Sequence, residues 1–373
     1  MSEERLPTLG ITGGRGFIAW HLRGRIHALG GFNPAAVGHE TFTDPAALER
    51  FVRRCDTIVH LAGMNRGDDA ELERVNVGLC ARLAQACERT GCAPQLIFAN
   101  STHLERDTAY GRSKRRGAEL LAAWAGRCGA RFVNLVLPQV FGECGRPFYN
   151  SVVATFCRQL ADGEAPRILE DRELELAHAQ DVAARILQLA AEGASGDVRL
   201  TGRCMTVIEL LSRLQALAER YNAHLLPPLP DEFDLSLFNT YRAYRFPGAY
   251  PARVELRSDA RGALFEAVSS LHGGQCFLST TLPGMTRGNH YHLRKFERFL
   301  VVRGLAVIRV RRLFSDEITE YRVSGGEPCY VDMPALHTHN ITNIGDGELT
   351  TLFWSHEIFD PRQPDTHAEP VKA

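Results

Sequence analysis

Four histidines and a glutamate in the last third of the chain have the spacing of a metal site. His290 and His292 alternate, so a β-strand would place both imidazoles on one face, and Glu297 returns on the second strand of the same hairpin. A second pair, His337 and His339, alternates in the same way. Three imidazoles and one carboxylate suit a divalent ion and favour zinc, with manganese, iron or nickel as alternatives. His337 could then be a base rather than a ligand.

A glycine-rich loop near the start of the chain has the features of a phosphate-binding turn. Gly13 and Gly16 lie between an apolar run, residues 8–12, and a segment with helical apolar spacing, residues 17–30. Glycines at these points let the backbone turn tightly and approach a pyrophosphate, which would lie at the positive end of the helix. Ala19 replaces the third glycine, a change that close helix packing tolerates. The loop predicts a dinucleotide site, and an ordinary tight turn is the alternative.

The residues after the next strand indicate which dinucleotide is bound. An NAD-type site has an acidic residue there for the ribose hydroxyls, and residues 35–39 contain none. Arg15 and His39 could instead face a 2′-phosphate. The sequence therefore predicts NADPH as the cofactor.

Tyr110 and Lys114 form a candidate catalytic pair. A spacing of four on a helix places phenol and ammonium on one face, where the cation is expected to favour the phenolate and lower the tyrosine pKa. Tyr110 could then protonate a carbonyl oxygen as hydride arrives, while Lys114 also holds the cofactor ribose. Ser101, at the end of an apolar run, could hydrogen-bond the same carbonyl, with Thr102 as the alternative. An exposed surface pair is the other explanation of this spacing.

Short apolar runs alternate with helical patterns as far as about residue 190, which is typical of parallel strands joined by crossover helices. The predicted strands are residues 8–12, 57–62, 95–100 and 132–138, and the predicted helices include residues 17–30 and 72–90. This order predicts a doubly wound α/β sheet of Rossmann type. A further helix is expected from Thr206, with Glu209 at capping-box spacing, to about Tyr221, where a Pro-rich stretch ends it.

The pattern changes after residue 246. Period-two apolar runs separated by glycine turns fill residues 253–357, with no convincing helix, which predicts an all-β jelly-roll barrel. We therefore expect two domains, residues 1–246 and 247–373. The Pro-rich tail, residues 361–373, should either lie over the barrel or be disordered.

Composition excludes several classes of protein. Lys plus Arg is 43 against 44 for Asp plus Glu, so a nucleic-acid partner is not expected. No stretch is apolar enough for a membrane span, and the charged start does not resemble a signal peptide, which predicts a cytoplasmic protein. The 10 cysteines contain no Cys-x-x-Cys pair and are expected to be reduced and mostly buried.

Several motifs together resemble those of the extended short-chain dehydrogenase/reductases, which modify nucleotide sugars. They are Thr12-Gly-x-x-Gly-Phe-Ile, His60-Leu-Ala-Gly63, Asn76 and Tyr110-x-x-x-Lys114. Four stretches are more narrowly similar to the bifunctional capsular-polysaccharide enzymes that make the precursor of UDP-N-acetyl-L-fucosamine. They are residues 60–66, Phe141-Gly, residues 146–157 and residues 363–366.

The resemblance implies an NADPH-dependent C4 reductase followed by a cupin that epimerises C3 of a UDP-4-keto-6-deoxy-N-acetylhexosamine. The product would be UDP-2-acetamido-2,6-dideoxy-L-talose. A ketone at C4 acidifies the C3 hydrogen, because the carbanion left behind is an enolate. Reduction would then trap the epimerised ketone as an alcohol. Two alternatives remain: a C4 reductase whose cupin only dimerises or binds ligand, and a sensing module that binds NADP(H) without turnover.

The resemblance also implies a fuller set of site residues. Expected cofactor contacts are Gly13, Arg15, Gly16, Phe17, Ile18, His39, Leu61, Ala62, Gly63, Asn76, Tyr110, Lys114 and Pro138. Expected substrate contacts are Asn65, Arg66, Asn150, Ser151 and Arg172. Expected metal ligands are His290, His292, Glu297 and His339, the last in the position of the fourth cupin ligand, and expected catalytic residues are Tyr110, Lys114, Ser101 and His337. The open edge of the barrel predicts a homodimer.

The chain departs from these families in a few places. The stretch between Ser101 and Tyr110 is short, Gln139 stands where many members have Asn, and Leu336 replaces the usual glycine of a cupin turn. Residues 259–266 resemble the entry motif of the sugar-nucleotide 3,5-epimerases, with a salt-bridged hairpin as the alternative.

Overall fold

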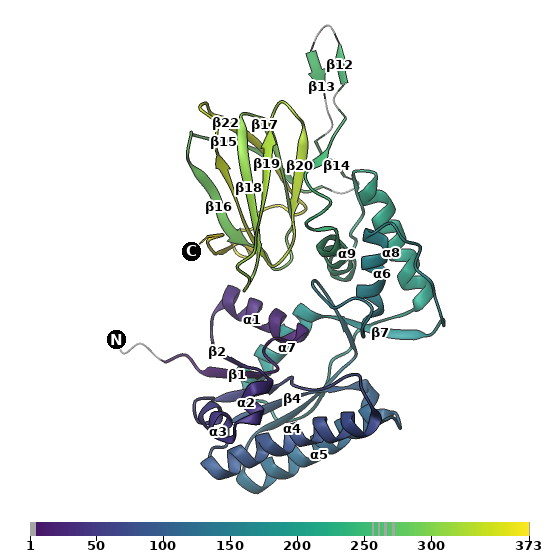
Figure 1. Ribbon diagram of the computed structural model, residues 1–373, viewed down its shortest axis with the longest axis vertical. Coiled ribbons are helices and arrows are strands. Elements are labelled where there is room, and N and C mark those ends of the chain that lie inside the picture. Colours follow the sequence, from purple (N-terminus) through teal and green to yellow (C-terminus); the bar gives the residue numbers. More distant parts are fainter. Residues whose placement is uncertain (1–4, 256, 260–261, 265–266, 271–272, 373) are drawn as a thin grey trace. The chain divides into compact units, whose positions relative to one another are not determined.

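The protein divides into two compact units (Figure 1). The computed structural model describes residues 5–255, 257–259, 262–264, 267–270 and 273–372. The first unit contains the chain up to Phe141 together with Phe148–Ser151 and Arg172–Thr206. The second unit contains Gly142–Pro147, Val152–Asp171 and the chain from Val207. The boundary predicted at residue 246 for two functional domains stays a prediction.

A six-stranded parallel sheet with the strand order β2-β1-β3-β4-β5-β8 is the centre of the first unit. Its strands are β1 Thr8–Thr12, β2 Asn33–Val37, β3 Thr57–His60, β4 Gln95–Ser101, β5 Phe132–Leu137 and β8 Gly196–Arg199. The strand order reverses direction between β1 and β3, which is where doubly wound sheets bind ligands. The predicted Rossmann-type fold is therefore confirmed.

Helices cover both faces of this sheet, and each face has its own hydrophobic core. The helices are α1 Phe17–Leu29, α2 His39–Thr43, α3 Pro45–Arg53, α4 Asp69–Thr90, α5 Ala109–Cys128 and α7 Ala179–Glu192. Alternation along β3 explains the two cores, because Val59 packs with residues of α1 and α7 whereas Ile58 packs with residues of α3, α4 and α5. A small sheet of β6 Gln139–Phe141, β7 Glu173–His178 and β9 Arg203–Thr206 completes the unit.

The second unit contains a cupin barrel built from two five-stranded antiparallel sheets. One sheet is β11 Ala252–Arg253, β20 Cys329–Met333, β17 Glu297–Arg303, β22 Leu349–Ser355 and β15 Gln275–Thr281. The other is β19 Ile318–Ser324, β18 Leu305–Arg312, β21 His337–Asn343, β16 Thr286–Tyr291 and β23 His367–Ala368. Their inner faces form one core that includes Phe299, Val310 and Val331. The all-β prediction is confirmed, and the tail lies over the barrel, since β23 pairs with β16.

Among the described residues, three helices belong to the same unit as the barrel: α6 Val152–Ala161, α8 Val207–Asn222 and α9 Glu232–Arg245. The sequence predicted α8 but missed α9. Asp231 caps α9 by accepting the N–H of Asp234 at 2.9 Å. Arg242 and Asp234 are buried on this helix, so its buried face is not uniformly apolar and its amphipathic pattern is weak.

A buried polar network joins these helices to the barrel. Arg298 of β17 donates two hydrogen bonds to Asp332 of β20, at 2.7 and 3.0 Å. Tyr221 of α8 donates to the same carboxylate, and Nε of Arg242 lies 3.4 Å from the Tyr221 hydroxyl. Arg242 also donates to the carbonyl of Met333 at 3.1 Å. The charges of Arg298, Asp332 and Arg242 are buried, so removing one of their partners would leave an uncompensated charge and destabilise the fold.

Among the described residues, no helix is long and apolar enough to span a lipid bilayer.

Candidate functional site

The glycine loop has the shape of a phosphate cradle. Gly13 has a φ of 66°, and a Cβ there would lie 3.0 Å from the backbone nitrogen of Ala62. A Cβ on Gly14 would lie 2.8 Å from the Cβ of Ala36, so the loop admits no side chain at either place. Gly16 begins α1 without a side-chain cap, which leaves helix N–H groups for an anion. These residues fit the pyrophosphate of a dinucleotide.

Thr12 holds the next loop against this cradle. Its hydroxyl accepts the N–H groups of Leu61 and Ala62 at 3.1 and 3.2 Å. With both lone pairs used, it must donate to Nδ1 of His60, 2.8 Å away. Burial lowers the pKa of His60 to about 3, so the ring is neutral and accepts this bond. The structure thus brings Gly13, Leu61 and Ala62 together and gives His60 a supporting role that the sequence analysis did not assign.

Asn76 supports the same loop from α4. Its Oδ1 accepts the N–H of Met64 at 2.7 Å, and its Nδ2 donates to the Met64 carbonyl at 3.0 Å and to Ser113 Oγ at 3.1 Å. Gly63 lies against it, since a Cβ there would be 3.3 Å from Asn76 Oδ1. Both ends of the Asn76 amide are therefore used to shape the loop.

An acidic residue lies close to the predicted 2′-phosphate site. Glu40, one residue beyond the stretch considered above, has its Oε1 3.6 Å from Nη2 of Arg15. Hydrogen bonds from the backbone at Glu40 and Gly38, together with Arg15, lower the pKa of Glu40, so it is ionised. The cofactor prediction rested on the absence of an acid, and this residue weakens that argument. His39 is the first residue of α2, next to Glu40.

Tyr110 and Lys114 lie on one side of the first turns of α5. The helix begins at Ala109, where Thr108 Oγ1 accepts the Gly111 N–H at 3.1 Å. Nζ of Lys114 is 5.7 Å from the centre of the Tyr110 ring and donates to the Ala99 carbonyl at 2.8 Å. The spacing argument thus predicted their relative placement.

The expected lowering of the Tyr110 pKa is not found. Burial raises the pKa of Tyr110 to about 12, and it also lowers the pKa of Lys114 to about 8. Desolvation outweighs the attraction between the two groups, because the ammonium is directed at a carbonyl oxygen rather than at the phenol. Tyr110 is therefore a protonated phenol at neutral pH.

Ser101 ends β4 and caps a 3-10 turn, Thr102–Glu105. Its Oγ accepts the N–H of His103 at 3.2 Å, and the His103 ring centre lies 6.0 Å from that of Tyr110. Thr102 lies within the turn itself.

A cavity of about 630 Å³ in the first unit brings Tyr110 together with two predicted substrate contacts, Asn65 and Arg66. Nε of Arg66 donates to Oδ1 of Asn150 at 2.7 Å, and its guanidinium lies 5.1 Å from the centre of the Tyr149 ring. Two other predicted substrate contacts lie elsewhere along the chain: Ser151 follows Asn150, and Arg172 lies just before β7. Pro138, a predicted cofactor contact, lies between β5 and β6.

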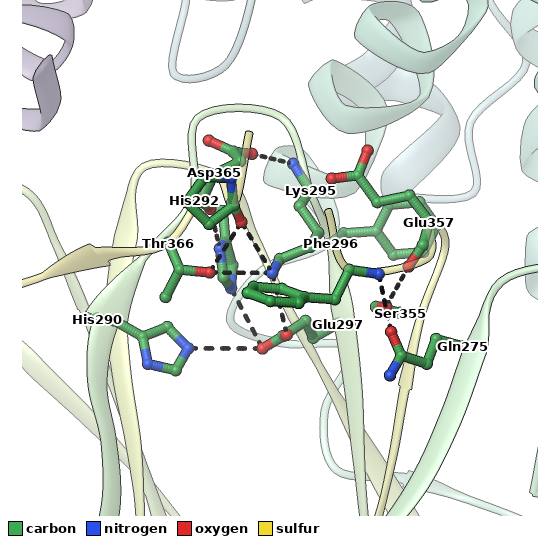
Figure 2. Close-up of polar contacts among 12 residues, drawn as sticks. Gln275, His290, His292, Lys295, Phe296, Glu297, Ser355, Glu357, Asp365 and Thr366 are labelled. Carbon is green, nitrogen blue, oxygen red and sulfur yellow. Dashed lines mark hydrogen bonds and ion pairs between the residues drawn. The ribbon is translucent and has the colours of Figure 1, made fainter. Parts of the chain in front are cut away.

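The four predicted metal ligands converge inside the barrel. Figure 2 shows three of them, His290, His292 and Glu297. One ligand atom from each of His290, His292, Glu297 and His339 lies within 4.8 Å of the others. Oε2 of Glu297 is 3.2 Å from Nε2 of His292 and 3.6 Å from those of His290 and His339. All three Nε2 atoms are buried without a hydrogen-bond partner. Orphaned nitrogens aimed at one carboxylate oxygen fit a bound divalent cation.

Main-chain carbonyls fix the orientation of the imidazoles. Nδ1 of His339 lies 3.0 Å from the carbonyl oxygen of His337, and Nδ1 of His292 lies 2.5 Å from that of Asp365. A carbonyl only accepts, so each Nδ1 carries the proton and each Nε2 has its lone pair towards the centre. Leu336, with a φ of 59°, donates its N–H to the His292 carbonyl at 2.8 Å at the turn before β21.

The charges at this centre are those that a metal requires. Burial lowers the pKa of His339 to about 4. The side chain of His290 is 23% exposed, against 1% for His292 and 0% for His339, so the centre is most accessible on the His290 side.

His337 is not among the converging ligand atoms. Its Nδ1 lies 2.8 Å from the Ala335 carbonyl, so Nε2 is the acceptor, and its ring centre is 5.0 Å from that of Phe246. Burial lowers the pKa of His337 to about 4, so the ring is neutral at pH 7. In the epimerase-like stretch, Arg261, Phe265 and Glu266 lie outside the described residues.

Residues 9–200 match the model of the NAD dependent epimerase/dehydratase family. The chain belongs to this family. Residues 257–367 match a second model, the polysaccharide biosynthesis C-terminal domain. The two matches agree with the α/β unit and the barrel described above.

Relatives of this chain match it across both parts. The protein is 30% identical, over 96% of its length and 97% of the relative's, to UDP-2-acetamido-2,6-beta-L-arabino-hexul-4-ose reductase of Pseudomonas aeruginosa. It is 31% identical to the capsular polysaccharide assembling protein CapF of Staphylococcus aureus, covering 98% of this chain and 100% of that chain with a TM-score of 0.61. A CapF structure with the inhibitor 3-isopropenyl-tropolone matches with 30% identity, over 98% of this chain and 100% of that chain, and a TM-score of 0.58. The resemblance to capsular-polysaccharide enzymes is therefore confirmed.

Proposed function

We propose that the protein is a bifunctional nucleotide-sugar enzyme. Its barrel epimerises C3 of a UDP-2-acetamido-2,6-dideoxy-4-keto-hexose, and its α/β unit then reduces C4 with NADPH to give UDP-2-acetamido-2,6-dideoxy-L-talose. The observation that carries the reductase is the cavity shared by Tyr110, Asn65 and Arg66 beside Lys114. The similarity to a reductase of a UDP-hexul-4-ose along nearly the whole chain supports the substrate class.

In the reductase, the chain's own residues position and protonate the substrate. Bound NADPH would supply the hydride for C4. Tyr110, held protonated by burial, gives its proton to the C4 oxygen as that oxygen gains charge. The positive charge of Lys114 then stabilises the phenolate that is left, and Lys114 also binds the cofactor ribose. Ser101 donates a hydrogen bond to the same oxygen, and Arg66 with Asn65, Asn150, Ser151 and Arg172 binds the UDP-sugar.

We infer NADPH rather than NADH from the charges around the glycine loop. Arg15 and His39 are the groups that would bind a 2′-phosphate. Glu40 pairs with Arg15 in the protein, so a 2′-phosphate must replace that carboxylate as the partner of the guanidinium. The preference for NADPH therefore depends on Arg15 releasing Glu40.

In the barrel, His337 is the proposed base. Its neutral ring, with Nε2 as the acceptor, takes the proton from C3, and the electron pair of the C–H bond moves into the C4 carbonyl to give an enolate. A proton from solvent then adds to the opposite face of C3, the electron pair returns from the enolate to re-form the ketone, and His337 releases its proton to solvent. A divalent ion on His290, His292, Glu297 and His339 would supply positive charge for the enolate. Zinc suits this ligand set.

We also propose a homodimer. β15 is an edge strand of its sheet, and Phe277 and Leu278 on it are 42% and 65% exposed. An edge strand with exposed apolar residues is suited to pairing with a second copy.

One experiment tests both activities in the full-length protein. The UDP-4-keto-6-deoxy-HexNAc is incubated in D₂O with and without NADPH and followed by NMR. We expect deuterium at C3 without NADPH, and a C4 alcohol only when NADPH is added. Reduction at C4 without deuterium at C3 would show that the protein is a C4 reductase and that its barrel does not epimerise C3. The absence of both reactions would reject the substrate class.

A further inference from the structure

The tail segment formed by residues 363–367 contacts the hairpin that carries three of the four metal ligands (Figure 2). The carboxylate of Asp365 accepts three consecutive backbone N–H groups at the β16–β17 turn. The distances are 2.9 Å from Leu293, 2.9 Å from Arg294 and 2.7 Å from Lys295. Asp365 is buried, so the turn between His292 and Glu297 is held by a residue distant in sequence.

The backbone of the same residue orients a ligand. The carbonyl of Asp365 accepts the Nδ1 proton of His292 at 2.5 Å, and Figure 2 shows His292 between Asp365 and Glu297. One residue therefore fixes both the path of the turn and the direction of the His292 lone pair. Supporting bonds of this kind set ligand orientation and basicity in metal sites.

Lys295 extends this support to the carboxylate ligand. Its Nζ donates to Thr366 Oγ1 at 3.0 Å and to the Pro364 carbonyl at 3.4 Å, and it lies 3.7 Å from Oε1 of Glu297. The other oxygen, Oε2, faces the three imidazoles. The ammonium thus occupies one side of the carboxylate and leaves Oε2 for the metal.

The tail also borders the remaining ligands. β23 pairs with β16, with His290 opposite Ala368, and Thr338, next to His339, donates its hydroxyl to the Glu369 carbonyl at 2.5 Å. Backbone from the end of the chain therefore lies beside β16, contacts β21 and caps the turn that leads to Glu297.

We infer that residues 363–367 are a positioning segment of the metal centre, with Asp365 as its main residue, and that they determine how tightly the ion is held. The inference rests on the metal site in the proposed function. It assigns no catalytic role to Asp365, which acts through His292 and the turn.

The test uses full-length protein with three single substitutions. Asp365→Asn keeps the size but places an NH₂ group against backbone N–H donors. Thr366→Val removes one Lys295 contact at an exposed position. Asp360→Asn is the matched control, because this carboxylate lies just before the tail and, among the described residues, accepts hydrogen bonds only from Arg362. Zinc affinity by chelator competition and the visible spectrum of the Co²⁺-substituted protein are measured.

We expect Asp365→Asn to weaken zinc binding by about 10–100-fold, the usual range for residues that support metal ligands, and to change the Co²⁺ bands. Thr366→Val should weaken it less, and Asp360→Asn should not change it. Thermal unfolding of the metal-free proteins shows whether the variants fold. If Asp365→Asn does not fold, Thr366→Val decides the question. Unchanged affinity and spectrum in a folded variant would overturn the inference, whereas parental protein that binds no metal would overturn the metal site itself.

Discussion

Lys114 Nζ donates to the carbonyl of Ala99 at 2.8 Å, while it lies 5.7 Å from the centre of the Tyr110 ring. The ammonium and the phenol are therefore held separately, one by the end of β4 and the other by the start of α5. We expect the two groups to act together only when substrate and cofactor are bound beside them. The two residues should accordingly respond differently to mutation and pH.

Tyr110→Phe should lower NADPH oxidation by about 100-fold or more, the usual contribution of a general acid, because the ring remains but the proton donor is lost. NADPH binding and the thermal unfolding temperature should be unchanged. Tyr149→Phe, which keeps the ring beside the Arg66 guanidinium, is the control and should have a much smaller effect. A Tyr110→Phe protein with near-parental turnover would show that the phenol is not the proton donor.

NADPH affinity should fall as the pH rises through about 8, because burial lowers the pKa of Lys114 to about 8 and its charge is lost there. The unfolded chain keeps this proton up to the ordinary pKa of 10.5, so the free energy of unfolding should rise with pH between about 8 and 10.5. Fluorescence titration and urea unfolding across this range measure the two effects. Lys114→Met should remove both, and a flat profile in the parental protein would contradict the assignment.

Substitutions of Arg15 and of Glu40 should change the preference for NADPH over NADH in opposite directions. We expect the parental protein to prefer NADPH over NADH by at least about tenfold, or 1.4 kcal/mol. Arg15→Ala should narrow the gap, and Glu40→Gln should widen it by freeing the guanidinium. The ratio of kcat/KM for the two cofactors checks this. A gap unaffected by either change would place the 2′-phosphate elsewhere.

Replacing His290 and His339 together by Ala should release the metal and abolish deuterium exchange at C3, since two of four ligands are lost. Reduction of a ketone that is already epimerised should continue. His337→Ala should instead retain the metal, because the carbonyl that orients His339 belongs to the backbone, and should lose only the exchange. Metal content by mass spectrometry and NMR exchange separate these outcomes. Exchange that survives in His337→Ala would exclude it as the base.

A fragment of residues 207–373 should unfold at a higher temperature than one of residues 247–373. The shorter fragment lacks Tyr221 and Arg242, which satisfy the buried Arg298–Asp332 pair, so polar groups at the barrel surface lose their partners. Calorimetry of the two fragments makes the comparison. Equal stability would show that α8 and α9 do not contribute to the barrel.

The elements that the sequence predicted well have an uninterrupted stretch of buried residues without polar side chains at their centre, as at residues 9–11 and 96–99. β1 and β4 are examples, because strands covered on both faces appear as continuous apolar runs. α9 was missed because Arg242 and Asp234 interrupt its buried face. The convergence of the candidate metal ligands was foreseeable, since alternation places His290 and His292 on one side of a strand.

The surroundings of the site were predicted less well than its central residues. Asp365 is far from His292 in sequence, and no local pattern indicates that its carbonyl orients that ring. Glu40 lies one residue past the stretch in which an acid was sought. The pKa of Tyr110 depends on burial, which spacing does not reveal.

The carbonyl groups that orient His292 and His339 are present whatever side chain occupies positions 365 and 337. No single amino-acid replacement deletes such an acceptor; it can only be displaced when the backbone shifts, as after an insertion or deletion. The geometry of the imidazoles should therefore persist through extensive divergence of the side chains around them. We expect relatives to differ more freely in the base and the lining of the barrel than in the length of the tail and of the turn before β21, so that new substrates can evolve around an unchanged centre.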